Sequence, residues 1–217
     1  MALETRNLFH IDTLLESKNL PITLRNLEFK DAPAFARLLS DPRNASDPNI
    51  KPMEIPTAQT VIARMRESAA EPTVYDARGK VVAGPSRVNL VVVLASEEQA
   101  EGTVIGLGGY GAIKRLERNG ATLRAGDVGA LIDADYRGKG YATEAMKLAM
   151  DWGFASVAQG GLQLDLVTLT TLADNEAVIK LIDGKLGLQG KSVTREAEVE
   201  GKMELYWELK KEDWIKN

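Results

Sequence analysis

One short stretch, Asp135-Tyr136-Arg137-Gly138-Lys139-Gly140-Tyr141-Ala142, limits the possible folds of this chain more than any other. A β-branched and aliphatic run, 128–132, precedes it, and small or apolar residues follow at three- and four-residue steps through Gly153. This order predicts a strand that enters a helix through a glycine turn. The first turn of such a helix has unpaired N–H groups and the positive end of the helix dipole. Because Arg137 and Lys139 add two cations there, the pattern is typical of a diphosphate site.

An ordinary tight turn between a strand and a helix would show the same two glycines, so the glycines alone decide little. The longer pattern Arg137-x-x-Gly140-x-Ala142 resembles the coenzyme A signature of the GNAT superfamily of N-acetyltransferases. The surrounding string is close to the form common in the RimJ/RimL-like branch. The resemblance implies that this turn binds the diphosphate of coenzyme A. The cofactor-binding residues that it implies here are Arg137, Gly138, Lys139, Gly140, Tyr141 and Ala142.

The same resemblance assigns a role to the strand before the turn. In this family the strand, here 128–133, has a bulge and separates from its neighbour. Pantetheine then pairs with the freed main-chain groups like an added strand. A backbone N–H near Leu131 or Ile132 would polarise the thioester carbonyl as an oxyanion donor does.

A second family signature, Asn-x-x-Ser followed by Gly and an aromatic residue, has a partial match after position 174. Asn175 matches the position that contacts the pantetheine region in the family, although an asparagine there would also cap its own helix. The match departs from the family because Val178 replaces the serine and Leu188 follows Gly187 in place of the aromatic residue. The segment is also one residue longer than usual. No tyrosine here matches the one that protonates the leaving thiolate in some family members.

Two residues are candidates for catalysis. Asp127 precedes Gly129 by the step at which RimJ/RimL-like proteins often have a glutamate that takes the amine's proton through water. A solvated carboxylate at the start of a strand is the alternative interpretation. Tyr110, in the glycine-rich segment 103–113, is a reserve candidate for orienting water or substrate, and a tyrosine at the edge of the core is its alternative.

The strength of the base that is needed depends on the amine. An α-amine with a pKa of about 7.7–8.0 is already roughly one tenth neutral at pH 7, so freeing it costs only about 1 kcal/mol. A lysine amine with a pKa near 10.4 would cost about 4–5 kcal/mol at the same pH. A short carboxylate such as Asp127 therefore favours an α-amine or another amine of low pKa.

Composition narrows the classes of function further. The formal net charge is −4, whereas a nucleic-acid binder usually has a basic excess. No apolar run reaches the ~20 residues that a membrane helix needs, and the first residues do not resemble a secretory signal. We therefore expect a cytoplasmic protein, with the nucleus as the other compartment left open, and no nucleic-acid or membrane partners. Its oligomeric state stays open, with a homodimer among the alternatives.

Cysteine is absent, and His10 is the single histidine. Disulfides, thiolate metal sites and a cysteine nucleophile are thereby excluded. A serine–histidine pair or a multi-histidine metal site is disfavoured, so we predict no metal site. We expect His10 to be functionally silent and to lie near a mobile end. Acetyl transfer would be direct, without a covalent acyl-enzyme on cysteine.

The order of elements predicts a mixed α/β fold. It matches a GNAT-like, mostly antiparallel central sheet that is splayed at its middle and has helices on both faces. We expect Thr57 to cap the second helix, and Met203, Leu205 and Trp207 to point inward. The expected strands are 22–25, 89–94, 103–113, 127–132, 164–170 and two within 191–210. The expected helices are 30–39, 58–69, 142 to about 159, and 175–184. The expected irregular segments are 43–56, 71–87 and 114–124, the last with Asn119-Gly120 at its tip.

We expect one N-acetyltransferase domain, 1–217, in which residues 1–20 are a peripheral N-terminal extension that wraps the surface or hangs loose. The predicted activity is transfer of acetyl from acetyl-CoA to a primary amine of a peptide N-terminus, an amino acid or a small molecule. One alternative is a non-catalytic coenzyme-A-binding or interaction module with the same fold. Another is a different α/β nucleotide binder.

Overall fold

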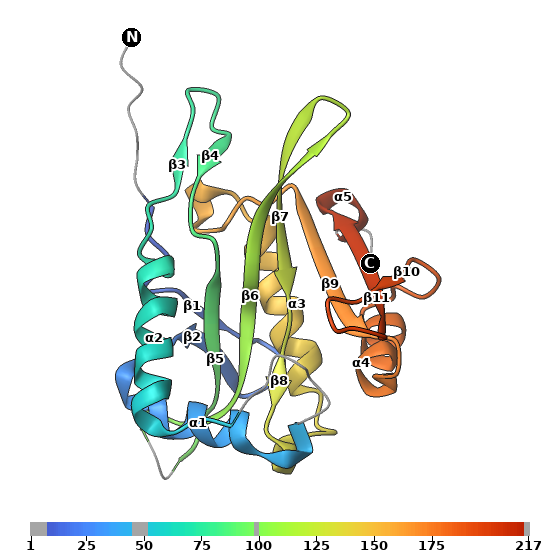
Figure 1. The fold of residues 1–217 in the computed structure, drawn as a ribbon. Helices are drawn as coiled ribbons and strands as arrows, with labels where there is room; N and C mark the ends of the chain where they lie inside the picture. The colour runs from blue at the N-terminus through green and yellow to red at the C-terminus, as the bar shows by residue number, and fades with distance from the viewer. Residues whose placement is uncertain (1–7, 45–51, 98–99, 215–217) are drawn as a thin grey trace.

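The computed structural model describes residues 8–44, 52–97 and 100–214 (Figure 1). Within them, a nine-stranded sheet runs in the order β1-β2-β5-β6-β7-β9-β11-β10, with β8 paired to β6 off this path. The strands of this sheet are β1 (Leu14–Glu16), β2 (Ile22–Asn26), β5 (Val88–Leu94), β6 (Thr103–Arg118), β7 (Ala121–Val128), β8 (Leu131–Ile132), β9 (Leu166–Leu172), β10 (Val193–Glu196) and β11 (Met203–Lys210). A separate hairpin joins β3 (Val74–Tyr75) and β4 (Val81–Ala83).

Helices lie on both faces of this sheet. The α-helices are α1 (Ala32–Ser40), α2 (Ile55–Ala69), α3 (Tyr141–Phe154), α4 (Glu176–Lys180) and α5 (Lys211–Trp214). Short 3₁₀ turns are η1 (Phe29–Asp31), η2 (Pro42–Asn44), η3 (Ala134–Tyr136) and η4 (Val157–Gln159), and η5 (Leu181–Lys185) is a π-helical turn. Figure 1 shows α1 and α2 in front of the sheet and α3 behind it.

The pairing of the strands confirms the predicted fold class. Every pair in the described sheet is antiparallel except β7 with β9. Two apolar clusters hold the layers together. The larger lies between the sheet and α3, and the smaller joins α1 and α2 to Val91 and Val93 of β5. The chain is therefore a mixed α/β fold with a mostly antiparallel sheet between two helical layers.

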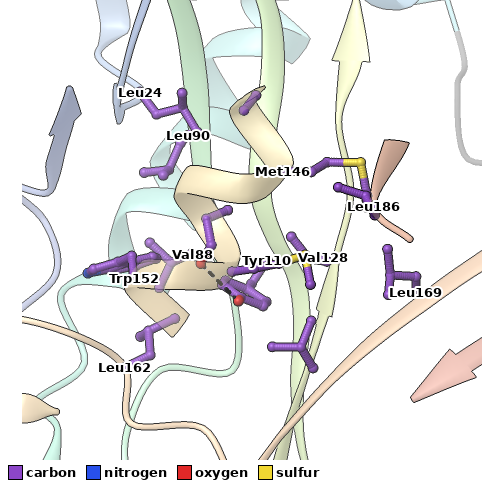
Figure 2. Packing of buried hydrophobic residues seen from close by; sticks show 14 of the residues in the cluster. Leu24, Val88, Leu90, Tyr110, Val128, Met146, Trp152, Leu162, Leu169 and Leu186 are labelled. Carbon is purple, nitrogen blue, oxygen red and sulfur yellow. Dashed lines mark hydrogen bonds between the residues drawn. The ribbon is translucent and has the colours of Figure 1, made fainter. Parts of the chain in front are cut away.

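The larger cluster contains the biggest buried side chains. Trp207 and Tyr110 are fully buried in it, and Figure 2 shows Tyr110 packed with Trp152 and Leu162 against α3. The prediction that β11 points its apolar side chains inward is right for Trp207. It is wrong for Met203, which is 45% exposed because it opens the strand beside the edge strand β10.

Two predicted boundaries are wrong for identifiable reasons. The charged segment 114–124 is not a connection, because it continues β6 and starts β7 as a protruding hairpin whose side chains are mostly exposed as far as Thr122, whereas Arg124 is buried. Its tip is Asn119-Gly120, as predicted, and both residues have positive φ. The second described helix, α2, begins at Ile55 with Glu54 as its N-cap and Pro56 in its first turn, so Thr57 is not the cap. The loop predicted over 43–56 falls partly on 45–51, outside the described residues.

The N-terminal segment from residue 8 packs onto the sheet. β1 pairs with β2, and Leu8 bridges Thr73. His10 is 1% exposed, is hydrogen-bonded through Nε2 to Thr73 Oγ1 at 3.0 Å, and meets Trp152 edge-on. His10 itself is therefore part of the packed structure. In the described part of the chain, no helix is both long enough and apolar enough to span a membrane.

Candidate active site

The sheet opens between β7 and β9. These strands pair in parallel only from Ala125 to Asp127, opposite 166–168. Beyond this point β9 continues to Leu172, whereas the chain after Val128 turns away and re-forms a ladder as β8, which pairs with β6 alone. Asp127 is thus the last residue paired with β9 before the strands separate. This is the separation of strands that the family resemblance implied.

The direction of the peptide groups in β8 distinguishes the two predicted carbonyl donors. Asp133 N–H donates to Ile105 O on β6 at 2.8 Å. Because peptide groups alternate direction along a strand, the N–H of Leu131 also faces β6, and that of Ile132 faces away from it. Ile132 is therefore the residue of this pair whose N–H points toward the opening.

The glycine turn after β8 has the conformation and the free space of a ligand cradle. Gly138 and Gly140 have φ of +79° and +87°, which is the left-handed region that favours glycine, and Gly140 is the N-cap of α3. A Cβ built at Gly138 would meet nothing within 4 Å, and one at Gly140 would approach only Leu20, at 3.7 Å. The first N–H groups of α3 therefore border open space. An anion such as a diphosphate fits there, because these N–H groups lack partners within the helix.

Arg137 is directed away from this space. Its Nε donates to Ile132 O at 3.0 Å, and its Nη2 donates to Asn44 Oδ1. Lys139 is exposed, with its Nζ 5.6 Å from the centre of the Tyr136 ring. Of the two predicted cations, Lys139 is the one free to meet a ligand at the turn, and Arg137 ties the turn to its surroundings.

A segment that the sequence did not single out, α1 with η2, holds the turn. Arg37 forms an ion pair with the buried carboxylate of Asp133, and Arg43 contacts Asp135 at 2.7 Å. Asn44 is 2% exposed, accepts from Arg137 and donates through Nδ2 to Leu38 O at 2.7 Å. We call Arg37, Arg43 and Asn44 the latch. Their spacing carries no motif, so no sequence signal pointed to them.

Asp127 lies on the sheet face opposite α3. Its neighbour Val128 packs in the α3 cluster, and successive residues of a strand face opposite sides. Thr168 and Thr170 of β9 donate their hydroxyls to Asp127 Oδ1 at 3.0 and 3.2 Å. Asp127 Oδ2 forms no hydrogen bond with any described residue. Burial raises the pKa of Asp127 above its ordinary value, and the two threonines and the charges of Lys114 and Arg195 oppose that rise.

A comparison with known protein families matches residues 22–189 to the acetyltransferase (GNAT) domain. This chain belongs to the GNAT acetyltransferase family. The match spans the splayed strands and the glycine turn, and it confirms the resemblance that the turn suggested.

Relatives and solved structures agree with this family. The uncharacterized N-acetyltransferase p20 of Bacillus licheniformis is 26% identical over 178 residues, 82% of this chain and 84% of that protein. The ribosomal-protein-S5-alanine acetyltransferase of Vibrio fischeri matches with a TM-score of 0.63 at 20% identity, over 94% of this chain and 99% of that one. RimJ of Mycobacterium smegmatis, solved in complex with CoA-disulfide, matches with a TM-score of 0.62 at 16% identity, over 98% of this chain and 91% of that one. At sequence identities of 16–20%, these two structures show only that their fold is shared with this chain.

Within this GNAT fold, Tyr110 belongs to the core. It is 0% exposed, and its hydroxyl donates to Ala149 O of α3 at 3.0 Å (Figure 2). Burial raises the pKa of this phenol well above its usual range. Tyr110 faces α3, on the side of the sheet away from Asp127, so the expectation that it orients water or substrate is corrected.

Asn175 caps α4, because its side-chain Oδ1 accepts from Val178 N at 3.4 Å. The structure therefore agrees with the alternative in which Asn175 caps its own helix. That Asn175 contacts the cofactor stays a prediction. The helix continues into a π-helical turn, with Leu186 N donating to Leu181 O at 3.1 Å. A π-turn accommodates one extra residue in a helix, which accounts for the longer segment noted in the sequence.

Polar side chains surround Asp127 on its face of the sheet. Tyr206 of β11 donates to Glu208 at 2.9 Å, and Glu208 pairs with Arg118. Arg195 stacks over the Tyr206 ring with its Cζ 4.0 Å from the ring centre. Burial and Glu208 raise the pKa of Tyr206 to about 12, so the phenol is protonated at neutral pH. The alternation along β11 places Tyr206 and Glu208 opposite Trp207, but the sequence did not mark them as functional.

Proposed function

We propose that this GNAT acetyltransferase uses acetyl-CoA to acetylate a primary amine directly, with Asp127 as the general base. The observation that carries the proposal is the position of Asp127 at the point where β7 and β9 separate. Membership of the GNAT family supports acetyl transfer as the reaction. The open glycine turn at the start of α3 fits the diphosphate of the cofactor. A coenzyme A form bound to the RimJ relative supports the same choice.

Different residues of this chain would bind different parts of acetyl-CoA. Backbone N–H groups from Gly138 to Ala142 would bind the diphosphate, with Lys139 adding a charge. The main chain of β8 would hold the pantetheine, and the N–H of Ile132 would donate to the thioester carbonyl. Acetyl-CoA supplies an activated acetyl group when it is bound. Leu131, whose N–H faces β6, would line the same opening with its side chain.

Asp127 would bind the amine and accept its proton at Oδ2. Its Oδ1 is held by Thr168 and Thr170, so the carboxylate has a fixed orientation with one oxygen left for the substrate. A raised pKa makes the carboxylate a stronger base than an exposed aspartate. An α-amine or another amine of low pKa suits such a base, because little free energy is needed to deprotonate it.

The experiment measures thiol release from acetyl-CoA with amines of graded pKa, comparing wild type with Asp127→Asn. We expect the variant to lose about 10²–10⁴-fold in kcat, the range for removal of a general base, and to keep its affinity for coenzyme A. Asp12→Asn is the matched control, because Asp12 is an exposed aspartate for which the structure shows no hydrogen bond to a described residue. An unchanged kcat in Asp127→Asn would remove Asp127 from the mechanism.

The same assay separates the enzyme from a non-catalytic coenzyme A binder. The departures Val178 and Leu188 motivate that alternative, because Val178 packs against the larger apolar cluster and donates its backbone N–H to Asn175, and Leu188 is buried. Binding of coenzyme A without turnover on any amine across pH 6–9 would favour the binder.

A further inference from the structure

A buried arginine lies far from the predicted cofactor turn. Arg124 of β7 is 7% exposed, and its Nη1 donates to Leu162 O. Its Nη2 has no hydrogen-bond partner among the described residues, and no described carboxylate lies close enough to form an ion pair. Asp165 accepts from the backbone N–H of Arg124 at 2.7 Å and leaves the guanidinium without a salt bridge. Buried charges in folded proteins are usually paired, so this arrangement needs an explanation.

A second arginine makes the arrangement more costly. Arg115 of β6 is the direct cross-strand partner of Arg124, and like charges at such positions repel. Arg115 forms no hydrogen bond or ion pair with any residue in the described ranges. Burial lowers the pKa of Arg124 to about 10; the charge of Asp165 opposes this shift and the charge of Arg115 adds to it, and the guanidinium is still charged at neutral pH.

These arginines line a pocket of about 260 Å³ between the β4–β5 connection and the β6–β7 hairpin. Its lining residues are Ala83, Gly84, Pro85, Ile113, Lys114, Arg115 and Arg124, with no acidic residue among them. The connection passes so close that a Cβ on Gly84 would lie 2.7 Å from Arg124 Nη2. Figure 1 places this hairpin at the end of the sheet opposite the start of α3.

We propose that this pocket is a binding site for a small oxyanion, with a phosphate or carboxylate group held by Arg115 and Arg124, which share one face of the sheet. One anion between the arginines would offset both the burial of Arg124 and its repulsion from Arg115. Guanidinium groups bind planar or tetrahedral oxyanions through paired N–H donors, which suits this chemistry. The pocket is smaller than the ~300–1,000 Å³ typical of drug-sized ligands, so a compact anion fits and a nucleotide does not.

The test measures thermal unfolding of the full chain with saturating coenzyme A, so that the glycine turn is already occupied. Sodium phosphate, sodium acetate and sodium chloride are titrated at matched ionic strength. We expect phosphate or acetate to raise the melting temperature by at least about 2 °C beyond chloride, because a ligand that binds only the folded state stabilises it. Phosphate alone would identify a tetrahedral anion, and acetate alone a carboxylate.

Arg115→Gln is the informative variant, because Arg115 forms no hydrogen bond or ion pair with the described residues and its loss leaves the core intact. We expect it to weaken the anion's affinity about tenfold or more, whereas Arg64→Gln, an exposed arginine of α2 outside the pocket, keeps the full response. Equal responses in both variants, or no stabilisation beyond chloride in wild type, would overturn the proposal. Binding of coenzyme A itself would be unaffected by either result.

Discussion

Asp127 is a largely buried carboxylate, which disfavours its charged form, and it lies at the point where β7 and β9 separate. Its carboxylate is largely buried, and the hydroxyls of Thr168 and Thr170 fix one oxygen, yet no described cation forms an ion pair with it. Burial penalises the charged form, and this is why the pKa of Asp127 is raised. Groups whose pKa is shifted by burial in an open part of a fold are candidates for proton transfer.

The first prediction concerns the stability of Asp127→Asn. Because the folded-state pKa is raised above the unfolded value, the ionised carboxylate opposes folding at neutral pH. Removing the charge should raise the melting temperature by about 2 °C at pH 7.5, and the gain should shrink as the pH falls and wild type becomes protonated. Differential scanning calorimetry at a series of pH values from 7.5 down to 4 measures this. A variant that is less stable than wild type at pH 7.5 would show that the carboxylate stabilises the fold.

The second prediction concerns His10. Burial, helped by the charge of Arg124, lowers the pKa of His10 from 6.5 to about 4. A lowered folded-state pKa means that stability is complete above pH 6.5 and is lost as the pH falls toward 4, by up to about 3 kcal/mol. His10→Gln should therefore lose less free energy of unfolding than wild type between pH 7 and pH 5 in urea titrations. His10 is the single histidine, so parallel curves for the two proteins would contradict the assignment.

At the scale of elements, the latch connects α1 and η2 to the loop before α3. Asn44 uses both ends of its amide, since Oδ1 accepts from Arg137 and Nδ2 donates to Leu38 O. Arg137 in turn fixes Ile132 O at the end of β8. The conformation of the glycine turn therefore depends on a segment almost 100 residues earlier in the chain, as the separation of 93 between Asn44 and Arg137 shows.

The third prediction tests the latch through Asn44→Ala. The change leaves a guanidinium N–H of Arg137 and the carbonyl of Leu38 without their partner, at a cost of about 1–3 kcal/mol of stability. Calorimetric titration should show coenzyme A binding about five- to tenfold more weakly, because the turn is less well ordered. In an Arg137→Gln background, Asn44→Ala should weaken coenzyme A binding much less, because the guanidinium that Asn44 contacts is already absent. Equal losses of affinity in both backgrounds would mean that Asn44 and Arg137 act independently.

How well the sequence predicted each element depended on whether neighbouring residues determine it. The strand–turn–helix unit at Gly138 and Gly140 was predictable, because glycine spacing and apolar periodicity are local. The N-terminal end of α2 was misplaced, because Thr57 looked like a cap while Pro56 had already started the helix. The latch could not be predicted, because it depends on contacts between distant segments, whereas a core position for Tyr110 was one of its two interpretations.

At the scale of the whole molecule, the two ends of the sheet differ. At one end the strands separate, β8 and the start of α3 meet, and Asp127 marks the point of separation. At the other end the β6–β7 hairpin brings Arg115 opposite Arg124 beside a pocket. The mixed α/β fold was predictable from the order of elements, and the mostly antiparallel sheet between helices was implied by the resemblance to the GNAT family. The pairing of Arg115 with Arg124 at the other end of the sheet was not predictable, because these residues meet only through the register of the hairpin.

The central claim is that the glycine turn at the start of α3 binds the diphosphate of coenzyme A, and the most direct test is calorimetric titration of coenzyme A into Gly138→Ala and Gly79→Ala. Both glycines have nearly the same positive φ, +79° and +78°, and open space around a Cβ, so both variants carry the same backbone strain of about 1 kcal/mol or more. We expect Gly138→Ala to bind coenzyme A at least about tenfold more weakly, because its methyl group enters the space of the ligand, and Gly79→Ala to bind like wild type. Equal affinity in the two variants would contradict the account.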